Sequence, residues 1–528
     1  MTSHQLIDLC VVALYMAAIT AYGIYVAKGA GKSTEHYFLG GRNLGWFVVG
    51  ASIFSSNIST TQFMSGSGLA HRIGVAAINN DLIGGLLLGL SAMLMIPMYI
   101  KSRLFTVPEF LERRYNRTAR LLFSWTYVLQ NVMSTPTGFY IGGLAVLGVF
   151  GFDPKYLSLA CIIVGVTIGS FSIMGGMTSI AKTDAVQIFL LIGGGLIVAI
   201  LGVHRAGGLM ALHGAMGATH FNLLLPRGTD MPWTALPGIA LHSCYFAFAS
   251  VHIVQKALAA KDQHHAQCGM LFAGGLKLLA IPLFAIPGIV AAKLYPDAVG
   301  DATYAFLVRD LLPVGVSGLM MAGLISALMA TADSGVVALG SVIALDIYPT
   351  MTKKPDDKKA IKLGRWVAGM VIAFGVLAAP YAQNLGPIYP FILRLSGFAF
   401  MPVGVCFVFG RFSRRVNHQG ALACLVSGVI LGFAYVIFTS LPPLKVLLPA
   451  WFGALHFYEI LPAFFALLTA TLFGVSWLTP APTEEKLAGL QPQGRPQLTG
   501  AENRPFWQRF QTWFAMFLGV VGLCYVVF

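Results

Sequence analysis

The chain has 528 residues, of which 57% are hydrophobic and only 10% are charged. That composition excludes an ordinary soluble domain and indicates an all-α polytopic membrane protein. The net charge of +14 does not indicate nucleic-acid binding, because most of the 34 Lys and Arg fall in alternate connections between apolar segments. Under the positive-inside rule, this pattern places both termini on the non-cytoplasmic side of a plasma (inner) membrane.

Segments long and apolar enough to cross a bilayer, which takes about 20 residues, occur about fourteen times. They lie at roughly 6–27, 45–70, 78–100, 121–150, 156–175, 181–204, 234–256, 267–293, 313–346, 363–382, 387–409, 419–440, 456–478 and 507–528. We expect a transporter core over 1–478, a flexible cytoplasmic connector over 479–506, which is rich in Pro, Gln and Gly, and a final transmembrane helix over 507–528. No soluble catalytic domain is left over, so we expect no enzyme.

The second segment contains an unusually polar run. From Ser55 to Gln62, every residue except Ile58 carries a hydroxyl or amide. Such a run is tolerated at membrane depth where backbone lines a wet cavity, as in the discontinuous helices of secondary transporters. The alternative is a continuous helix whose Ser and Thr bond back to their own carbonyls. Because Asn57 and Gln62 are too polar for simple back-bonding, we favour a broken helix, which indicates transport.

Ionisable residues inside predicted spans are candidates for a functional role, because inserting each into the membrane costs at least about 2.5–3.5 kcal/mol of free energy. They are Asp81, Asp184, Lys277, Asp333 and Arg394. For Asp184, the alternative to a functional role is solvation near a helix end. Asp333 could instead form a buried pair with Lys277 or Arg394, and Lys277 could snorkel to the interface. We expect Arg394 to be structural.

Oxygen atoms that suit a hard monovalent cation gather in two segments. Ser55 and Thr331 supply hydroxyls, and a break near Ser55 and Ile58 would free backbone carbonyls. In the ninth segment Ala327, Ala330 and Thr331 are three or four residues apart and share one helix face. This chemistry predicts a sodium site between the broken helix and that face.

A series of motifs between residues 37 and 348 resembles a known family. The motifs are Tyr37-Phe38-Leu39-Gly40-Gly41-Arg42, Ser56-Asn57-Ile58-Ser59 with Gln62, Gly66-Ser67-Gly68, Thr106-Val107-Pro108-Glu109-Phe110-Leu111, Gly175-Gly176 with Thr183-Asp184, Gln255-Lys256-Ala257-Leu258-Ala259-Ala260-Lys261, Leu311-Leu312-Pro313-Val314-Gly315, Thr331-Ala332-Asp333-Ser334 and Asp346-Ile347-Tyr348. In this order they resemble the sodium:solute symporter family, the group of the sodium/glucose and sodium/proline cotransporters. The resemblance implies a leucine-transporter-type fold. Helices two to six and seven to eleven would form a 5+5 inverted repeat, with one extra helix before it and three after.

The resemblance also implies site residues. The implied sodium ligands are Ser55, Ile58, Ala327, Ala330 and Thr331, and a second site for sodium or a proton matches Asp184, Asp333 and Ser334. The candidate substrate contacts are Asn57, Gln62, Asp81, Ser243, Phe246 and Lys277. Many relatives carry a hydroxyl where this chain has Ala330.

Compared with bacterial sodium/galactose-type members, Asp81 stands in place of Glu and Ser243 in place of Asn. Phe246 lacks the hydroxyl of a gating Tyr, and Leu393 replaces a polar contact. Fewer hydrogen-bonding groups indicate a solute other than galactose, because buried polar contacts dominate such discrimination.

We therefore expect a sodium-coupled symporter that imports a small polar organic solute, most readily a sugar or sugar derivative. Its partners would be that solute, Na⁺ and the lipid bilayer, and not nucleic acid. Two alternatives stay open: a sodium-coupled carboxylate or amino-acid symporter, and a proton-coupled carrier that uses Asp184 or Asp333. A sensor is disfavoured because no soluble signalling domain is evident, and a channel because no filter repeat is present.

Overall fold

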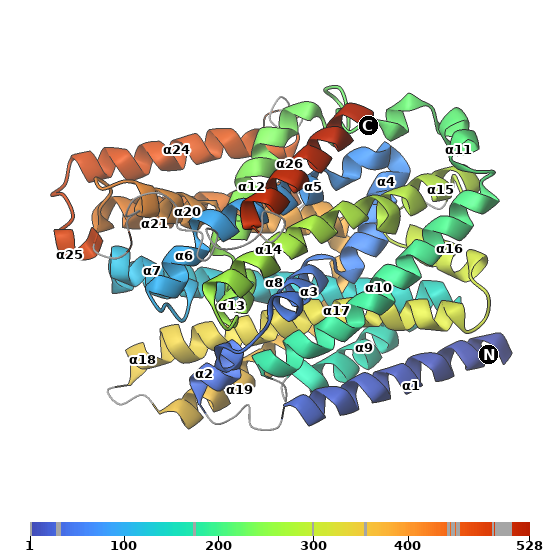
Figure 1. The fold of residues 1–528 in the computed structure, drawn as a ribbon, viewed down its shortest axis with the longest axis horizontal. Helices are drawn as coiled ribbons and strands as arrows, with labels where there is room; N and C mark the ends of the chain where they lie inside the picture. Colours follow the sequence, from blue (N-terminus) through green and yellow to red (C-terminus); the bar gives the residue numbers. More distant parts are fainter. Residues whose placement is uncertain are drawn as a thin grey trace.

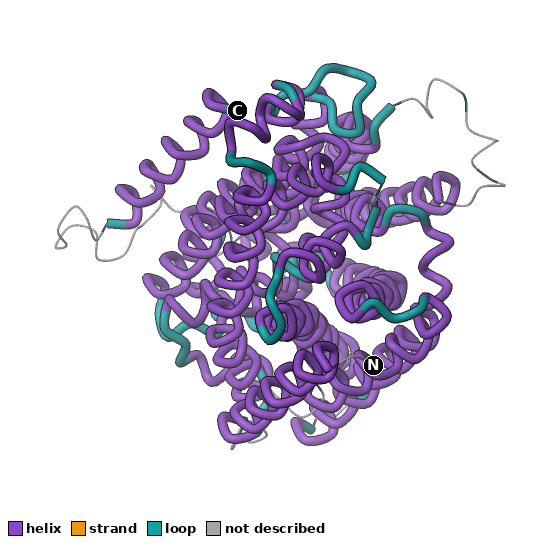
Figure 2. Tube along the Cα trace, turned by 90° about the vertical axis from the view of Figure 1, so that its right-hand side faces the viewer, coloured by secondary structure: helices purple, strands orange, loops and turns teal. Residues whose placement is uncertain are grey.

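A computed structural model describes residues 3–27, 33–172, 176–297, 300–352, 356–440, 455–487 and 509–528, with the single positions 444, 449 and 490. Within these residues the chain is helical and contains no β-strand (Figure 2). The predicted all-α class is therefore confirmed.

The helices of the first part of the chain run up to residue 221. They are α1 (Ser3–Val26), α2 (Thr34–Leu39), η2 (Gly40–Arg42), α3 (Trp46–Asn57), η3 (Gln62–Gly66), α4 (Ser67–Ile73), η4 (Gly74–Ile78), α5 (Asn79–Leu94), α6 (Ile96–Lys101), α7 (Val107–Arg114), α8 (Arg117–Phe150), η5 (Pro154–Tyr156), α9 (Leu157–Ser172), α10 (Met177–Arg205), α11 (Leu209–Met216) and η6 (Ala218–Phe221).

The remaining helices run from residue 233 to the end of the chain. They are η7 (Trp233–Ala235), α12 (Leu236–Ala249), α13 (Val251–Leu258), α14 (Gln263–Leu276), η8 (Lys277–Leu279), η9 (Ile281–Ala285), α15 (Ile286–Leu294), α16 (Thr303–Leu311), α17 (Val316–Ser341), η10 (Val342–Ile347), α18 (Tyr348–Met351), α19 (Asp357–Ala378), η11 (Ala379–Leu385), α20 (Ile388–Phe412), α21 (His418–Ser440), α24 (Phe457–Trp477), α25 (Glu484–Leu487) and α26 (Phe510–Val527).

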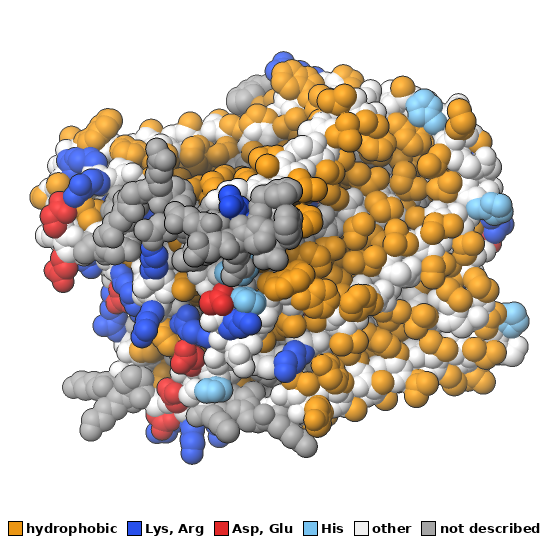
Figure 3. Space-filling view, viewed as in Figure 1, with side chains coloured by type: hydrophobic (Ala, Val, Ile, Leu, Met, Phe, Trp, Pro, Cys, Tyr) orange, Lys and Arg blue, Asp and Glu red, His pale blue; other side chains and the backbone are white. Residues whose placement is uncertain are grey.

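Most long helices run roughly parallel or antiparallel to one axis of the molecule (Figure 1). Apolar side chains cover the middle of the visible face, whereas charged side chains gather at the end that carries α7, α18 and α25 (Figure 3). Within the described residues, eleven helical runs are long and apolar enough to cross a membrane, or twelve if a bent pair counts as one span. Apolar helices of this length, with an apolar surface around the middle of the molecule, are expected of an integral membrane protein. The predicted count of about fourteen is not established, since α9 is shorter and the run Gln62–Leu94 contains parts of two predicted segments.

Close helix packing places α3 at the centre of the molecule. Helix α14 packs against α3 and α5, and α10 packs against α3 and α17. A Cβ atom added at Gly50 of α3 would lie 2.6 Å from the carbonyl oxygen of Gly269 in α14. Likewise, a Cβ atom at Gly85 of α5 would lie 2.7 Å from the carbonyl oxygen of Gly274. Small residues let backbones approach in this way, as is common between membrane helices.

The predicted last transmembrane helix corresponds to α26, which lies against α5. The rings of Phe514 and Phe517 fill the space beside Gly89 and Gly85. Most of the predicted connector 479–506 lies outside the described residues, and its described part contains α25. The three-part division of the chain stays a prediction.

Candidate functional site

The predicted break in the second segment is present, and a side chain closes it. Helix α3 ends at Asn57, and Ile58 takes non-helical angles of φ −90° and ψ 85°. The Ser59 N–H and Oγ donate to Oε1 of Gln62 at 2.9 Å and 2.7 Å, and Nε2 of Gln62 donates to the Asn57 carbonyl at 2.5 Å. Because buried backbone groups must be paired, the Gln62 amide replaces bonds that the break removes. The prediction of a broken helix is confirmed.

A second break lies where α12 and α13 meet, with a bend of 41°. Ser250 at the junction is extended, with φ −70° and ψ 124°, and its Oγ lies 3.1 Å from Nδ1 of His252. The sequence did not predict this break, because its neighbours Ala249 and Val251 carry no polar signal. The two interrupted helices are the first of each predicted repeat, the position at which secondary transporters bind substrate and coupling ions.

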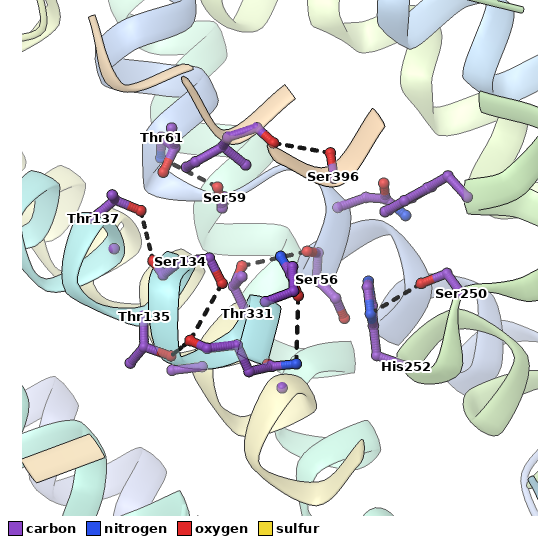
Figure 4. Close-up of a pocket in the computed structure, with 18 of the residues that line it drawn as sticks. Ser56, Ser59, Thr61, Ser134, Thr135, Thr137, Ser250, His252, Thr331 and Ser396 are labelled. Atoms are coloured by element: carbon purple, nitrogen blue, oxygen red, sulfur yellow. Dashed lines mark hydrogen bonds between the residues drawn. The ribbon is translucent and has the colours of Figure 1, made fainter. Parts of the chain in front are cut away.

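Both breaks line one cavity of about 280 Å³. The first contributes Ser56 and Asn57, and the second contributes Ser250 and His252. Residues of α5, α8, α12, η8, α17, α19 and α20 also line the wall (Figure 4). Among the described residues on this wall, Lys277 is the only one with a permanently charged side chain. The rest are hydroxyl, amide, imidazole, aromatic and aliphatic groups, so the cavity suits a polar solute of modest size.

Helix α8 adds polar groups to the wall that sequence reasoning missed. They are Gln130, Asn131, Ser134, Thr135 and Thr137. The Oγ1 atoms of Thr135 and Thr137 donate to carbonyls one turn back at 2.6 Å, and this keeps them in the helix (Figure 4). The signal was available, because these residues are a polar cluster inside a predicted span, as 55–62 is.

Five of the six predicted substrate contacts line the cavity. They are Asn57, Gln62, Ser243, Phe246 and Lys277, and the substituted position Leu393 lines it as well. Asp81 does not, because it is fully buried behind the wall and its neighbour Asn80 lines the cavity instead. Its Oδ1 accepts a hydrogen bond from Nζ of Lys277 at 2.9 Å. Asp81 is therefore paired with Lys277, which itself lines the cavity.

A neutral hydrogen-bond network joins four helices beside this ion pair. The His242 ring lies 2.9 Å from Oγ of Ser396 and 3.2 Å from the hydroxyl of Tyr458. That hydroxyl donates to Oδ1 of Asn80 at 3.0 Å. His242, Ser396 and Asn80 all line the cavity, so groups that both donate and accept are held in place there.

The first predicted sodium site lies where α17 meets the broken end of α3. Oγ1 of Thr331 is 3.1 Å from the Ala327 carbonyl and 3.4 Å from the Ser56 carbonyl. The other predicted ligands, Ser55, Ile58 and Ala330, are buried. Hydroxyl and carbonyl oxygens from the two predicted segments therefore come together, and neutral oxygens suffice for a monovalent cation.

The second predicted site is equally buried. Asp184 has no exposed surface, so interfacial solvation does not account for it. Its Oδ2 accepts from Oγ of Ser52 at 2.5 Å, and Oγ of Ser334 lies 3.1 Å from Oγ of Ser56. Asp333 is 1% exposed. Lys277, considered above as a partner of Asp333, forms its ion pair with Asp81.

The second site also holds a cation that sequence reasoning missed. Nζ of Lys256 lies 3.0 Å from Oδ2 of Asp184, and both residues are buried. In the sequence, Lys256 was noted only as part of a motif, since it is the last residue of the predicted seventh span, 234–256.

Comparisons with known proteins show the family of the chain. The model of the family described as "Sodium:solute symporter family" matches residues 37–428. The sodium/glucose cotransporter of Vibrio parahaemolyticus is 29% identical, with 83% of this chain and 86% of that protein covered. The sodium/myo-inositol cotransporter 2 of Sus scrofa is 27% identical, with 92% of this chain and 78% of that protein covered.

Solved structures show the same fold. A substrate-bound outward-open state of a Na⁺-coupled sialic acid symporter matches with a TM-score of 0.76 at 22% identity, covering 90% of this chain and 98% of that one. A closed conformation of Mhp1, a nucleobase-cation-symport-1 family transporter, matches with a TM-score of 0.57 at 16% identity, covering 85% and 97%. The predicted leucine-transporter-type fold is confirmed.

Proposed function

Because the chain belongs to the sodium:solute symporter family, we propose that it imports a small neutral polyhydroxylated solute, a sugar or sugar derivative, together with Na⁺ by alternating access. Sodium is the coupling ion of this family. The observation that carries the choice of solute is the charge balance of the cavity.

The positive charge on the cavity wall is already compensated. Lys277 is paired with buried Asp81, and the described groups around the pair are neutral hydrogen-bonding side chains. A polyol needs donors and acceptors without net charge, and this wall supplies both. A carboxylate solute would need an uncompensated cation, so the carboxylate and amino-acid alternative has less support. The names of the sodium/glucose and sodium/myo-inositol relatives support the same solute class.

Ion and solute would meet at adjacent residues of the first break. The Ser56 carbonyl faces Thr331, and the next residue, Asn57, lines the cavity. An ion that holds the end of α3 in place therefore also holds part of the solute wall, and such coupling must be reciprocal. Sodium that enters down its gradient supplies about 2.3 kcal/mol per charge per 100 mV of membrane potential.

The proposal includes an orientation in the plasma membrane. The charged end of the molecule would face the cytoplasm, in keeping with the positive-inside rule. Both termini would then lie on the other side. The N-terminus lies at the end opposite to α7 and α25, and α26 runs toward that end (Figure 1).

Uptake into proteoliposomes tests the proposal. We expect an inward Na⁺ gradient to drive accumulation of a radiolabelled hexose or inositol, and choline in place of Na⁺ to abolish it. A small carboxylate and an amino acid serve as comparison solutes under the same gradient. Accumulation driven by a proton gradient without sodium would contradict the coupling, and accumulation of only the acid would contradict the solute class.

A further inference from the structure

The ammonium group of Lys256 lies within a buried cluster of oxygen atoms. Its Nζ donates to the Ser52 carbonyl at 2.8 Å, to Oδ2 of Asp184 at 3.0 Å and to Oγ of Ser56. Lys256 is 1% exposed and Asp184 is 0% exposed. The acceptors belong to α3 and α10, whereas Lys256 belongs to α13, just beyond the second helix break. One side chain thus joins both broken helices.

These acceptors are also what a small monovalent metal ion would need. Carbonyl, hydroxyl and carboxylate oxygens are the ligands of hard cations. An ammonium group has three donors and no acceptor, and the three contacts of Lys256 use all of them. Asp184 keeps one further buried oxygen, Oδ1, which has no hydrogen-bond partner among the described residues.

The cluster overlaps the site predicted for a second sodium ion. Asp184 belongs to both, and Ser56, which accepts from Lys256, lies 3.1 Å from Ser334 through their hydroxyls. Asp333, the third predicted ligand, interacts electrostatically with Lys256. A sodium ion at Asp184 would therefore lie beside an ammonium in a buried site, where like charges repel strongly.

We propose that the Lys256 ammonium takes the place of a second sodium ion, so that this chain binds one Na⁺, at the Thr331 site. That the one ion binds at Thr331 rests on the proposed function, whereas the role of Lys256 as a resident cation does not. Removal of the ammonium alone leaves the buried Asp184 carboxylate with the Ser52 hydroxyl as a partner but without its counter-charge, an arrangement that a free cation stabilises.

Equilibrium binding of radioactive sodium to the purified full chain, without solute, tests this directly. We expect one Na⁺ per wild-type molecule and two per molecule of Lys256→Gln. The double variant Lys256→Gln/Asp184→Asn should again bind one Na⁺ per molecule, because it lacks both the ammonium and the carboxylate charge. Lys261→Gln is the matched control: its side chain is exposed a few residues further along, and it should bind one ion.

Two sodium ions in the wild type would overturn the proposal, as would one ion in folded Lys256→Gln. If Lys256→Gln does not fold, the wild-type count decides between one resident ammonium and two sodium ions. No sodium in the wild type with one in Lys256→Gln would contradict sodium binding at Thr331 but support the lysine's role. One bound ion without uptake of any polyol would contradict only the proposed solute.

Discussion

At the level of single residues, Thr331 makes the contact through which α17 reaches the broken end of α3. If its hydroxyl ligates Na⁺, Thr331→Ala removes an interaction with a charged group worth about 1.5–3 kcal/mol. We expect the half-saturating Na⁺ concentration for uptake to rise by roughly 10- to 150-fold, while Thr331→Ser stays close to wild type. Sodium titration of uptake in proteoliposomes measures this. Equal sodium requirements in wild type and Thr331→Ala would remove the residue from the site.

Asp81 controls the charge of the cavity wall although it does not reach the cavity. Asp81→Asn leaves the Lys277 ammonium buried without its partner, and breaking such a pair costs about 3–5 kcal/mol. We therefore expect lower thermal stability and weaker uptake of a neutral polyol. The uptake affinity for a small acid should stay unchanged or increase, because the ammonium of Lys277 can then pair with a carboxylate of the solute. Thermal unfolding and uptake affinities for both solute classes measure these effects.

The control is the double variant Asp81→Asn/Lys277→Gln, which removes both charges. It should recover part of the lost stability and show no gain for the acid. If neither solute affinity changes in Asp81→Asn, the ion pair serves folding alone, and the charge-balance argument for a polyol fails.

Neither ion pair of the site could be predicted from the sequence, for the same physical reason. Asp81 and Lys277 are 196 residues apart, and Asp184 and Lys256 are 72 residues apart. The sequence shows that each of these charged residues costs free energy inside a membrane. Only the packing of the helices shows which residue of opposite charge lies beside it. Asp81 was therefore predicted as a substrate contact, and Lys256 was overlooked.

At the level of elements, the two helix breaks differ in how they can be recognised. The first is encoded locally, because Ser55 to Gln62 places polar side chains in an apolar helix and Gln62 closes the break itself. The second bends by 41° at Ser250, which lies between the apolar residues Ala249 and Val251. One break was thus predictable from the sequence and the other was not.

Gln62 supports the first break, so its loss should affect ion and solute together. Gln62→Ala removes both amide contacts to Ser59 and Asn57, and buried backbone groups without partners cost about 1–3 kcal/mol. We expect the half-saturating concentrations of Na⁺ and of the solute both to rise. Uptake titrated separately in each measures the two effects.

Gln130→Ala is the matched control, because Gln130 lines the same cavity from α8 and makes no described contact with the break. Gln130→Ala should lower the affinity for the solute and leave the half-saturating Na⁺ concentration unchanged. A Gln62→Ala variant that changes only the solute affinity would make Gln62 an ordinary substrate contact.

At the level of the whole molecule, sequence reasoning predicted the architecture well, because membrane helices are encoded by local apolar length and the motif series is ordered along the chain. The number of spans was harder to predict. Where helices break or kink, as between Gln62 and Leu94, one helical run contains parts of two predicted segments. The positive-inside pattern depends on that count, so the orientation of the chain needs its own experiment.

Single cysteines at the two ends of the molecule test the orientation. Lys155, between α8 and α9, and Lys101, at the end of α6, are both exposed and belong to opposite sets of connections. In intact cells, a membrane-impermeant maleimide should label Lys155→Cys and not Lys101→Cys, with exposed Cys10 replaced by Ser. After permeabilisation both should react, which controls for buried thiols. The positive-inside rule is the physical reason, because basic loops near membrane helices stay in the cytoplasm. The reverse labelling pattern would place both termini in the cytoplasm and the charged end outside, and would contradict the proposed orientation.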